Sequence, residues 1–146
     1  MQRRIQLWQK PDTFFLVLRD QDSSDCVATK NNLQEIIKKT GKLNRSLVRI
    51  ACHSLESFYL GDLAAVEAGL DVRGIAKLQT KRKFKTPDKL ANANDEMDKI
   101  TNRSYQKIDG SRRIASFLAL DGSNKSVSFN MLISGVKTML GSRSGY

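Results

Sequence analysis

Two short apolar runs with a helical pattern between them constrain the fold of this chain more than any other feature. The first run is FFLVL at residues 14–18, and the second is LVRIAC at residues 47–52. Such runs, rich in branched and aromatic side chains, are typical of strands covered on both faces. Apolar residues between them recur at helical spacing: Cys26, Leu33, Ile36 and Ile37. This order predicts a βαβ unit with parallel strands and a right-handed crossover, so the fold class is α/β.

The remaining segments have helical patterns, and the helix of the βαβ unit has recognisable ends. Ser23 or Ser24 is expected to cap it, with Asp25 in its first turn, and Gly41 ends it. After the second strand, a helical segment breaks at Gly61, and Asp62 caps the helix that follows, which runs to Ala68. Further helices are predicted within residues 92–104, within 110–120 with Ile114, Phe117 and Leu118, and within 126–140 with Phe129, Leu132, Ile133, Val136 and Leu140. The carboxyl-terminal half is therefore expected to be helical, and the final GSRSGY segment to fray.

The predicted sheet is incomplete. Two strands do not make a stable parallel sheet, because such sheets need covered faces and further neighbouring strands. We therefore expect a strand to be missing from this sequence. The unpaired edge that results predicts association with another copy, aggregation, or cover by the chain's own terminal residues.

The length and composition indicate one small domain. A chain of 146 residues fits a single domain, residues 1–146. No apolar run approaches the ~20 residues that a membrane helix needs, and the amino end, MQRRIQLWQK, has no secretory core. Cys26 and Cys52 lack the spacing of a zinc site, which favours reduced thiols and a cytoplasmic location over a structural disulfide.

The strong positive charge indicates a polyanionic partner. The net charge is +10, and residues 73–89 hold seven Lys or Arg against the single acid Asp88. The candidate nucleic-acid contacts in this segment are Lys81, Arg82, Lys83 and Lys85. The alternative is a solvated loop whose lysines serve solubility.

Two aspartates follow the first predicted strand at the point where it ends. Asp20 and Asp22 are two residues apart, so in extended backbone both carboxylates point the same way. Two such charges repel unless a cation lies between them, and Mg²⁺ prefers carboxylate oxygens. Glu56 follows the second strand and becomes a third acid at the same edge, because parallel strands end together. The sequence thus predicts a Mg²⁺ or Mn²⁺ site, with helix capping and a turn as the alternative for the aspartates.

Few other groups suggest chemistry. His53, the only histidine, is either a structural residue or a catalytic one. The chain has no G-x-S-x-G, no P-loop and no G-x-G-x-x-G motif. The segment YQKIDGSRR at residues 105–113 supplies Lys107, Arg112 and Arg113 after an aromatic anchor, Tyr105. These cations either hold a scissile phosphate beside the acidic site or form a basic loop and helix start.

Five ordered blocks resemble a known family, the bacterial domain-of-unknown-function family 4276. They are FFLVLRDQDSSDC, VRIACHSLESFYLGDLAAVEAGL, KTPDKL, YQKIDGSRRIASFLAL and SVSFNMLISGV, and the resemblance extends from about Arg4 to Val136. The family is related to the Toprim fold of topoisomerases, primases and overcoming-lysogenization-defect nucleases. Its members often neighbour ATPases in phage-defence loci. The resemblance implies a Toprim-like core with Asp20 and Asp22 as metal ligands, and it aligns Lys107 with the family's Tyr-Gln-Lys lysine.

The sequence departs from the family pattern in two places. The family has Glu-Leu-Glu after the second of these strands, whereas Ser54, Leu55 and Glu56 stand here, so only the second acid is kept. Toprim domains also carry a general acid/base Glu after an upstream first strand that this chain lacks. The resemblance therefore implies a domain without its amino-terminal segment, which agrees with the strand missing from the sheet.

Three functions are consistent with these residues. The leading one is a Mg²⁺-dependent nucleic-acid phosphodiesterase module with Asp20, Asp22, Glu56 and Lys107 as catalytic residues, active if the upstream segment is supplied. The second is a non-catalytic subunit that binds nucleic acid or an ATPase. The third is a haloacid-dehalogenase-type phosphatase, whose D-x-D also follows a strand. Arg19 and the Ser23-Ser24 pair depart from the pattern of that third class.

Overall fold

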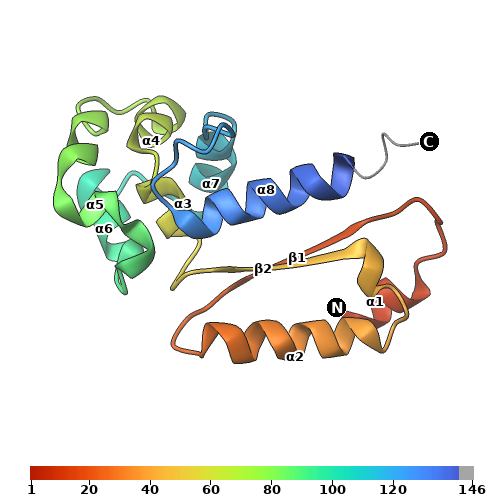
Figure 1. Cartoon of the computed structure of the whole chain (residues 1–146). Coiled ribbons are helices and arrows are strands. Elements are labelled where there is room, and N and C mark those ends of the chain that lie inside the picture. The colour runs from red at the N-terminus through yellow and green to blue at the C-terminus, as the bar shows by residue number, and fades with distance from the viewer. Residues whose placement is uncertain (142–146) are drawn as a thin grey trace.

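The βαβ unit predicted from the two apolar runs is present in the computed structural model, which describes residues 1–141 (Figure 1). Strand β1 spans Phe15–Asp20, helix α2 spans Cys26–Lys38 and strand β2 spans Ser46–Ala51. The strands are parallel, and the register pairs Phe15 with Ser46 and Asp20 with Ala51. The α/β class and the parallel pairing are confirmed. Within residues 1–141 the sheet has these two strands alone.

The cap of α2 differs from the prediction. Asp25 is the N-cap residue, and its carboxylate accepts a hydrogen bond from the Ala28 N–H at 2.6 Å. The serine caps predicted at Ser23 and Ser24 were therefore wrong. A carboxylate at this position both accepts the orphan N–H and interacts favourably with the positive end of the helix dipole.

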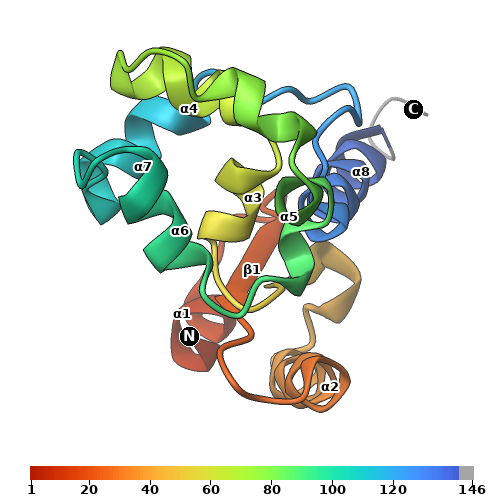
Figure 2. The ribbon, with the colours of Figure 1, turned by 90° about the vertical axis from the view of Figure 1, so that its left-hand side faces the viewer.

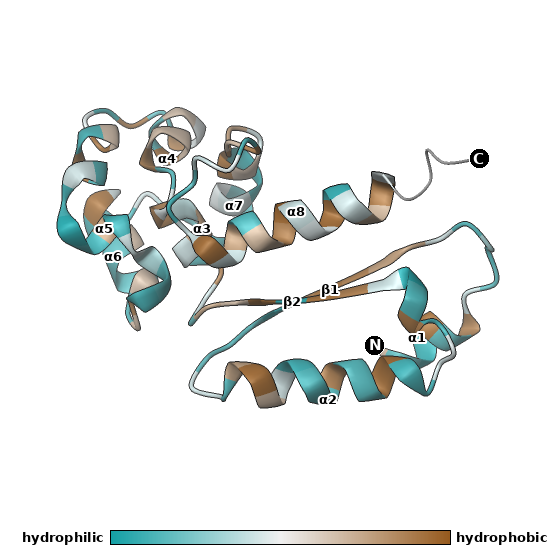
Figure 3. Ribbon diagram, in the orientation of Figure 1, coloured by the Kyte–Doolittle hydropathy of each residue, from teal (hydrophilic) through white to brown (hydrophobic). Residues whose placement is uncertain are grey.

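The two faces of the sheet are covered by different helices. On one face, α1 (Gln2–Leu7) and α2 pack on the strands, and a small core forms there from Ile5, Leu33, Ile37, Val48 and Ile50. On the other face α8 (Val127–Gly141) packs on β2. A Cβ at Gly135 of α8 would lie 2.5 Å from the Arg49 guanidinium and 3.0 Å from Leu47, so glycine permits this close approach. Figure 3 shows the apolar strands lying between α2 and α8.

The helical half lies beyond the carboxyl ends of the strands (Figure 1). Its helices are α3 (Glu56–Leu60), α4 (Leu63–Leu70), α5 (Arg82–Lys85), α6 (Ala93–Ile100) and α7 (Lys107–Ala115), with 3₁₀ turns at 76–80 and 87–89; a further 3₁₀ turn, 43–45, precedes β2. The break at Gly61 and the cap at Asp62 are confirmed, since the Asp62 carboxylate accepts from the Ala65 N–H at 3.1 Å. Helix α4 runs to Leu70, two residues beyond the predicted end.

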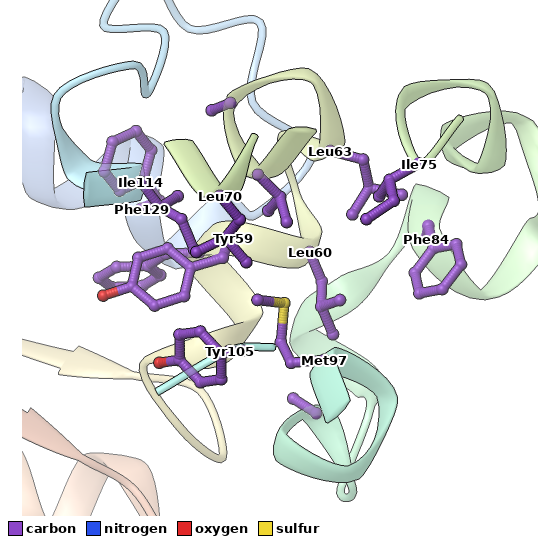
Figure 4. Packing of buried hydrophobic residues seen from close by; sticks show 14 of the residues in the cluster. Tyr59, Leu60, Leu63, Leu70, Ile75, Phe84, Met97, Tyr105, Ile114 and Phe129 are labelled. Carbon is purple, nitrogen blue, oxygen red and sulfur yellow. The ribbon is translucent and has the colours of Figure 1, made fainter. Parts of the chain in front are cut away.

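The larger buried core of the molecule lies in this helical half. Leu60, Leu63, Phe84, Met97 and Ile114 are fully buried there (Figure 4). In α8, Phe129 and Leu132 are buried and Ile133 and Val136 are partly buried, as the predicted stripe requires, whereas Leu140 is 56% exposed. Phe117, predicted on the inner face of a helix, is 55% exposed because α7 ends at Ala115. Of the GSRSGY segment, only Gly141 lies within the described residues.

Gln79 fastens the basic segment to the helical core. Its side-chain carbonyl accepts from the Leu63 N–H at 2.7 Å. Its amide group donates to the carbonyls of Leu60 at 3.1 Å and Phe84 at 2.7 Å. One side chain thus satisfies three backbone groups that the turn between α3 and α4 and the end of α5 leave unpaired. The segment is therefore an ordered part of the fold.

Candidate functional site

The carboxyl ends of β1 and β2 are joined by hydrogen bonds between the loops that follow them. The Gln21 N–H donates to the Ala51 carbonyl, and the Asp22 N–H donates to the His53 carbonyl, both at 2.9 Å. The His53 N–H in turn donates to the side-chain carbonyl of Gln21 at 3.2 Å. Figure 2 looks onto this end of the sheet, with α3 in the middle, α6 and α7 on one side and α5 on the other. The loops that carry the predicted acids are therefore held together.

Asp22 does not continue the strand as the sequence analysis assumed. Strand β1 ends at Asp20, and Asp22 has φ 53°, in the left-handed region. His53, on the facing loop, has φ 58°. Non-glycine residues adopt this conformation at a cost, which the paired loops offset here. Asp22 is therefore not in extended backbone, and the expectation that its carboxylate points the same way as that of Asp20 does not follow.

Glu56 is placed by the first turn of α3, directly after the β2 loop. Its side chain is only 4% exposed. The Tyr105 hydroxyl donates to the Glu56 Oε1 at 3.1 Å and lies 3.0 Å from the Ser111 Oγ. The Tyr59 ring meets the Tyr105 ring edge-on, with centroids 6.1 Å apart (Figure 4). Glu56 is thus a buried carboxylate held by a hydroxyl network, as a buried acid requires.

The acids at this edge influence one another. The pKa of Asp20 is raised, first by burial, then by the negative charges of Glu56 and Asp22. A backbone hydrogen bond from Leu55 and the positive charge of Lys107 lower the same pKa in part. The three predicted acids and Lys107 therefore share one electrostatic environment, although they come from segments far apart in the sequence.

The two tyrosines of the network remain protonated. Burial is the largest cause that raises the pKa of Tyr105, and the negative charge of Glu56 adds to it, while the bond with Ser111 lowers it. Burial also raises the pKa of Tyr59, with smaller contributions from Glu56 and Asp20. Their hydroxyls therefore act as hydrogen-bond donors at neutral pH rather than as nucleophiles.

Helix α7 separates the cations that the sequence analysis grouped. Lys107 and Ser111 are four residues apart and share the face that turns toward the acids. On the same helix, a Cβ at Gly110 would lie 2.7 Å from the Tyr105 ring, so the helix packs closely on that side chain. Arg112 lies about 100° further round the helix from Ser111 and is exposed. Arg113 faces Asp109 at 4.0 Å. The structure brings Lys107 to the acids and leaves Arg112 and Arg113 elsewhere.

The donors suit a hard divalent cation but do not form a closed cage. Within residues 1–141, no three or more His, Cys, Asp or Glu side chains are arranged to hold a metal ion. Mg²⁺ is usually held by one or two carboxylates and keeps several waters, so Asp20 with one neighbouring acid meets its needs. The crowding of negative charge at Asp20 is also what a bound cation relieves. Asp20 and one neighbouring acid would supply oxygen ligands of the kind that a partly hydrated Mg²⁺ or Mn²⁺ takes.

The basic segment is exposed, but one of its cations is engaged. Lys81, Arg82, Lys83 and Lys85 are all exposed around the buried Phe84. Lys83 bonds to the Glu96 carboxylate at 2.5 Å, and this bond is the largest cause that lowers the pKa of Glu96. In the described part of the chain, the ion pairs include none with the other three cations of the segment. Lys83 is therefore part of the internal structure, and the other three cations face solvent.

Sequence reasoning missed two residues of the hydroxyl network. Tyr59 was read only as part of a helical segment, and Ser111 was not considered. The position of Ser111, one helical turn after Lys107, indicates that it shares a helix face with that lysine, and this could have predicted its place near the acids. Tyr59 gave no comparable signal, because a buried aromatic residue in an apolar helix is ordinary core.

The fold and the site define a class of protein. It is an α/β protein with carboxylates at the edge where two parallel strands end. The family model described as Domain of unknown function (DUF4276) matches residues 1–137, so the chain belongs to this family. Searches of the curated proteins and of the solved structures gave no match. Among the helices of residues 1–141, none has the length and apolar character to cross a membrane.

Proposed function

We propose that the chain is a divalent-metal-dependent phosphodiesterase module that acts on nucleic acid. The single observation that carries the proposal is that the charges of Glu56, Asp22 and Lys107 all act on Asp20, at the carboxyl end of β1. In open α/β sheets, ligands bind at this edge. Carboxylates beside one lysine provide for a cation and for a phosphate at the same place.

Each side chain has a role in this proposal. Asp20 and Asp22 hold Mg²⁺ or Mn²⁺, with Glu56 as the third acid. The bound ion supplies Lewis-acid activation and offsets negative charge on a phosphate. Tyr105 and Ser111 keep the Glu56 carboxylate in place, and Lys107 contacts the phosphate through its ammonium group. Lys81, Arg82 and Lys85 contact the nucleic-acid backbone. Arg112 and Arg113 contact the same backbone further from the acids.

The wider setting of the proposal rests on family resemblance. Within it, the βαβ unit is a Toprim-like core, and the module works in the cytoplasm with an ATPase partner in phage defence.

A second candidate is a non-catalytic subunit that binds nucleic acid through the basic segment. The observation that favours it is the lack of a three-donor metal cluster in residues 1–141. Both candidates predict salt-dependent binding through Lys81, Arg82 and Lys85, because phosphate contacts release counterions. They differ in whether the bound strand is cut.

Cleavage and binding assays with matched variants test the proposal. The chain is assayed alone and extended upstream by a strand followed by a Glu. The extended form should bind single-stranded DNA or RNA and cut it with Mn²⁺ or Mg²⁺, and Asp20→Asn in it should abolish cutting while binding persists. Asp95→Asn, which changes an exposed acid on α6, is the control and should cut like wild type. Binding without cutting by both forms of the chain supports the second candidate. Equal cutting by wild type and Asp20→Asn removes the acidic edge from the mechanism.

A further inference from the structure

Strand β1 has a free edge whose hydrogen-bonding groups can be assigned. The Gln21 N–H donates to the Ala51 carbonyl, so the odd-numbered residues of β1 direct their backbone groups toward β2. The N–H and C=O groups of Leu16 and Leu18 therefore point the other way. Within residues 1–141, no further strand pairs with this edge. An open strand edge of this kind is a template for another strand.

The side chains at this edge are apolar and uncovered. Leu16 is 49% exposed and Leu18 is 38% exposed, on the face of the sheet where α8 packs on β2. A groove of about 500 Å³ lies at the start of the strand, lined by α1 residues and by 14–17. The apolar run at residues 14–18 is expected to be covered on both faces, and the cover over Leu16 and Leu18 is incomplete here.

We propose that β1 pairs with β1 of a second copy of this chain, antiparallel about a two-fold axis at Val17. The sequence of the strand is complementary to itself in this register. Leu16 of each copy lies opposite Leu18 of the other. The backbone groups of both residues point toward the second copy, so each Leu16–Leu18 pair exchanges two hydrogen bonds. The four leucine side chains then meet on one face of the sheet.

The charged residues agree with the same register. Arg19 lies opposite Phe15 of the second copy, where the guanidinium meets an aromatic ring rather than a like charge. A shift by two residues would instead place the Asp20 carboxylate opposite Leu16 and leave one leucine pair, Leu18 with Leu18, in place of two. The two-fold arrangement makes one closed dimer with a four-stranded sheet, β2-β1-β1-β2.

Mass measurement by light scattering over a range of concentrations tests the dimer. The wild-type chain should change from monomer to dimer as its concentration rises. The double variant Leu16→Lys and Leu18→Lys should remain monomeric, because each lysine would lie directly opposite a lysine of the second copy. Leu140→Lys, at an equally exposed leucine on α8, is the control and should dimerise like wild type. Circular dichroism of each variant verifies that the fold is kept.

A cross-linking experiment tests the register. In a background with Cys26→Ser and Cys52→Ser, Val17→Cys places two thiols on the axis, in a non-hydrogen-bonded pair with Cα atoms about 4.5 Å apart. Oxidised glutathione should convert this variant to a disulfide-linked dimer with release of two reduced glutathiones, whereas Leu140→Cys should stay unlinked. A wild-type chain that is monomeric at every concentration, or a dimer that the leucine variants do not change, would overturn the proposal.

Discussion

The strand half of the molecule, residues 2–51, and the helical half, helices α3–α7 within residues 56–115, differ in how completely each buries its apolar side chains. The helical half contains the larger core, with Leu60, Leu63 and Ile114 fully buried. The strand half has a small core on one face and leaves Leu16 and Leu18 exposed on the other. The difference teaches that the buried apolar surface is concentrated in the helical half, whereas the strand half leaves part of its apolar surface at an open edge.

The candidate site lies across the boundary between these halves. Asp20 and Asp22 come from the strand half, and Glu56, Tyr105 and Lys107 come from the helical half. A local opening of the strand half alone would therefore separate Asp20 and Asp22 from Glu56. Any ligand that binds both sets of acids joins the two halves, and this coupling makes the comparison testable.

The largest expected effect is the contrast between a buried and an exposed leucine. Leu60→Ala should lower the free energy of unfolding by about 2–5 kcal/mol, because it removes buried methyl groups and leaves a cavity. Leu16→Ala should change it by less than about 0.5 kcal/mol in the monomer. Urea unfolding of both variants at low protein concentration measures the difference. Similar losses for the two would show that β1 is as well packed as the helical core.

A smaller effect is expected from the hydroxyl that holds Glu56. Tyr105→Phe keeps the ring but leaves the buried Glu56 carboxylate without its donor, which should cost about 1–3 kcal/mol. Tyr59→Phe is the matched control and should cost less, since Glu56 accepts its bond from Tyr105. The same urea experiment measures both. If the two substitutions cost the same, Glu56 does not depend on the Tyr105 hydroxyl.

The smallest expected effect depends on pH, and it is a gain in stability, opposite in sign to the losses expected for Leu60→Ala and Tyr105→Phe. The pKa of Asp20 is raised in the folded chain above its ordinary value of 3.8, first by burial and then by Glu56 and Asp22. Folding therefore takes up protons at this site, and the wild-type chain loses stability as the pH rises through the raised pKa. Asp20→Asn should accordingly raise Tm slightly at pH 7 and lose this gain below pH 3.8. A lower Tm for Asp20→Asn at pH 7 would show that the charged carboxylate is stabilising.

Sequence reasoning recovered the architecture because its signals are local. The apolar runs that became β1 and β2, the break at Gly61 and the cap at Asp62 each follow from a few adjacent residues. The positive φ of Asp22 could not be predicted, because it depends on a hydrogen bond with the His53 carbonyl, distant in sequence. The bond between Lys83 and Glu96 and the network around Tyr105 likewise arise from tertiary packing. The positions of the three acids after the two strands were therefore predictable, and their geometry was not.

Paramagnetic broadening by Mn²⁺ in the amide NMR spectrum tests the central claim most directly, that the acids of the two halves form one cation site. Substoichiometric Mn²⁺ should broaden the amides of residues 20–22, 53–56 and 105–108 together, and Asp20→Asn should abolish this broadening at the same Mn²⁺ concentration. Because the ion would be held from both halves, amides from each must respond. Broadening confined to exposed acids such as Asp95, or an equal response in the Asp20→Asn variant, would contradict the account.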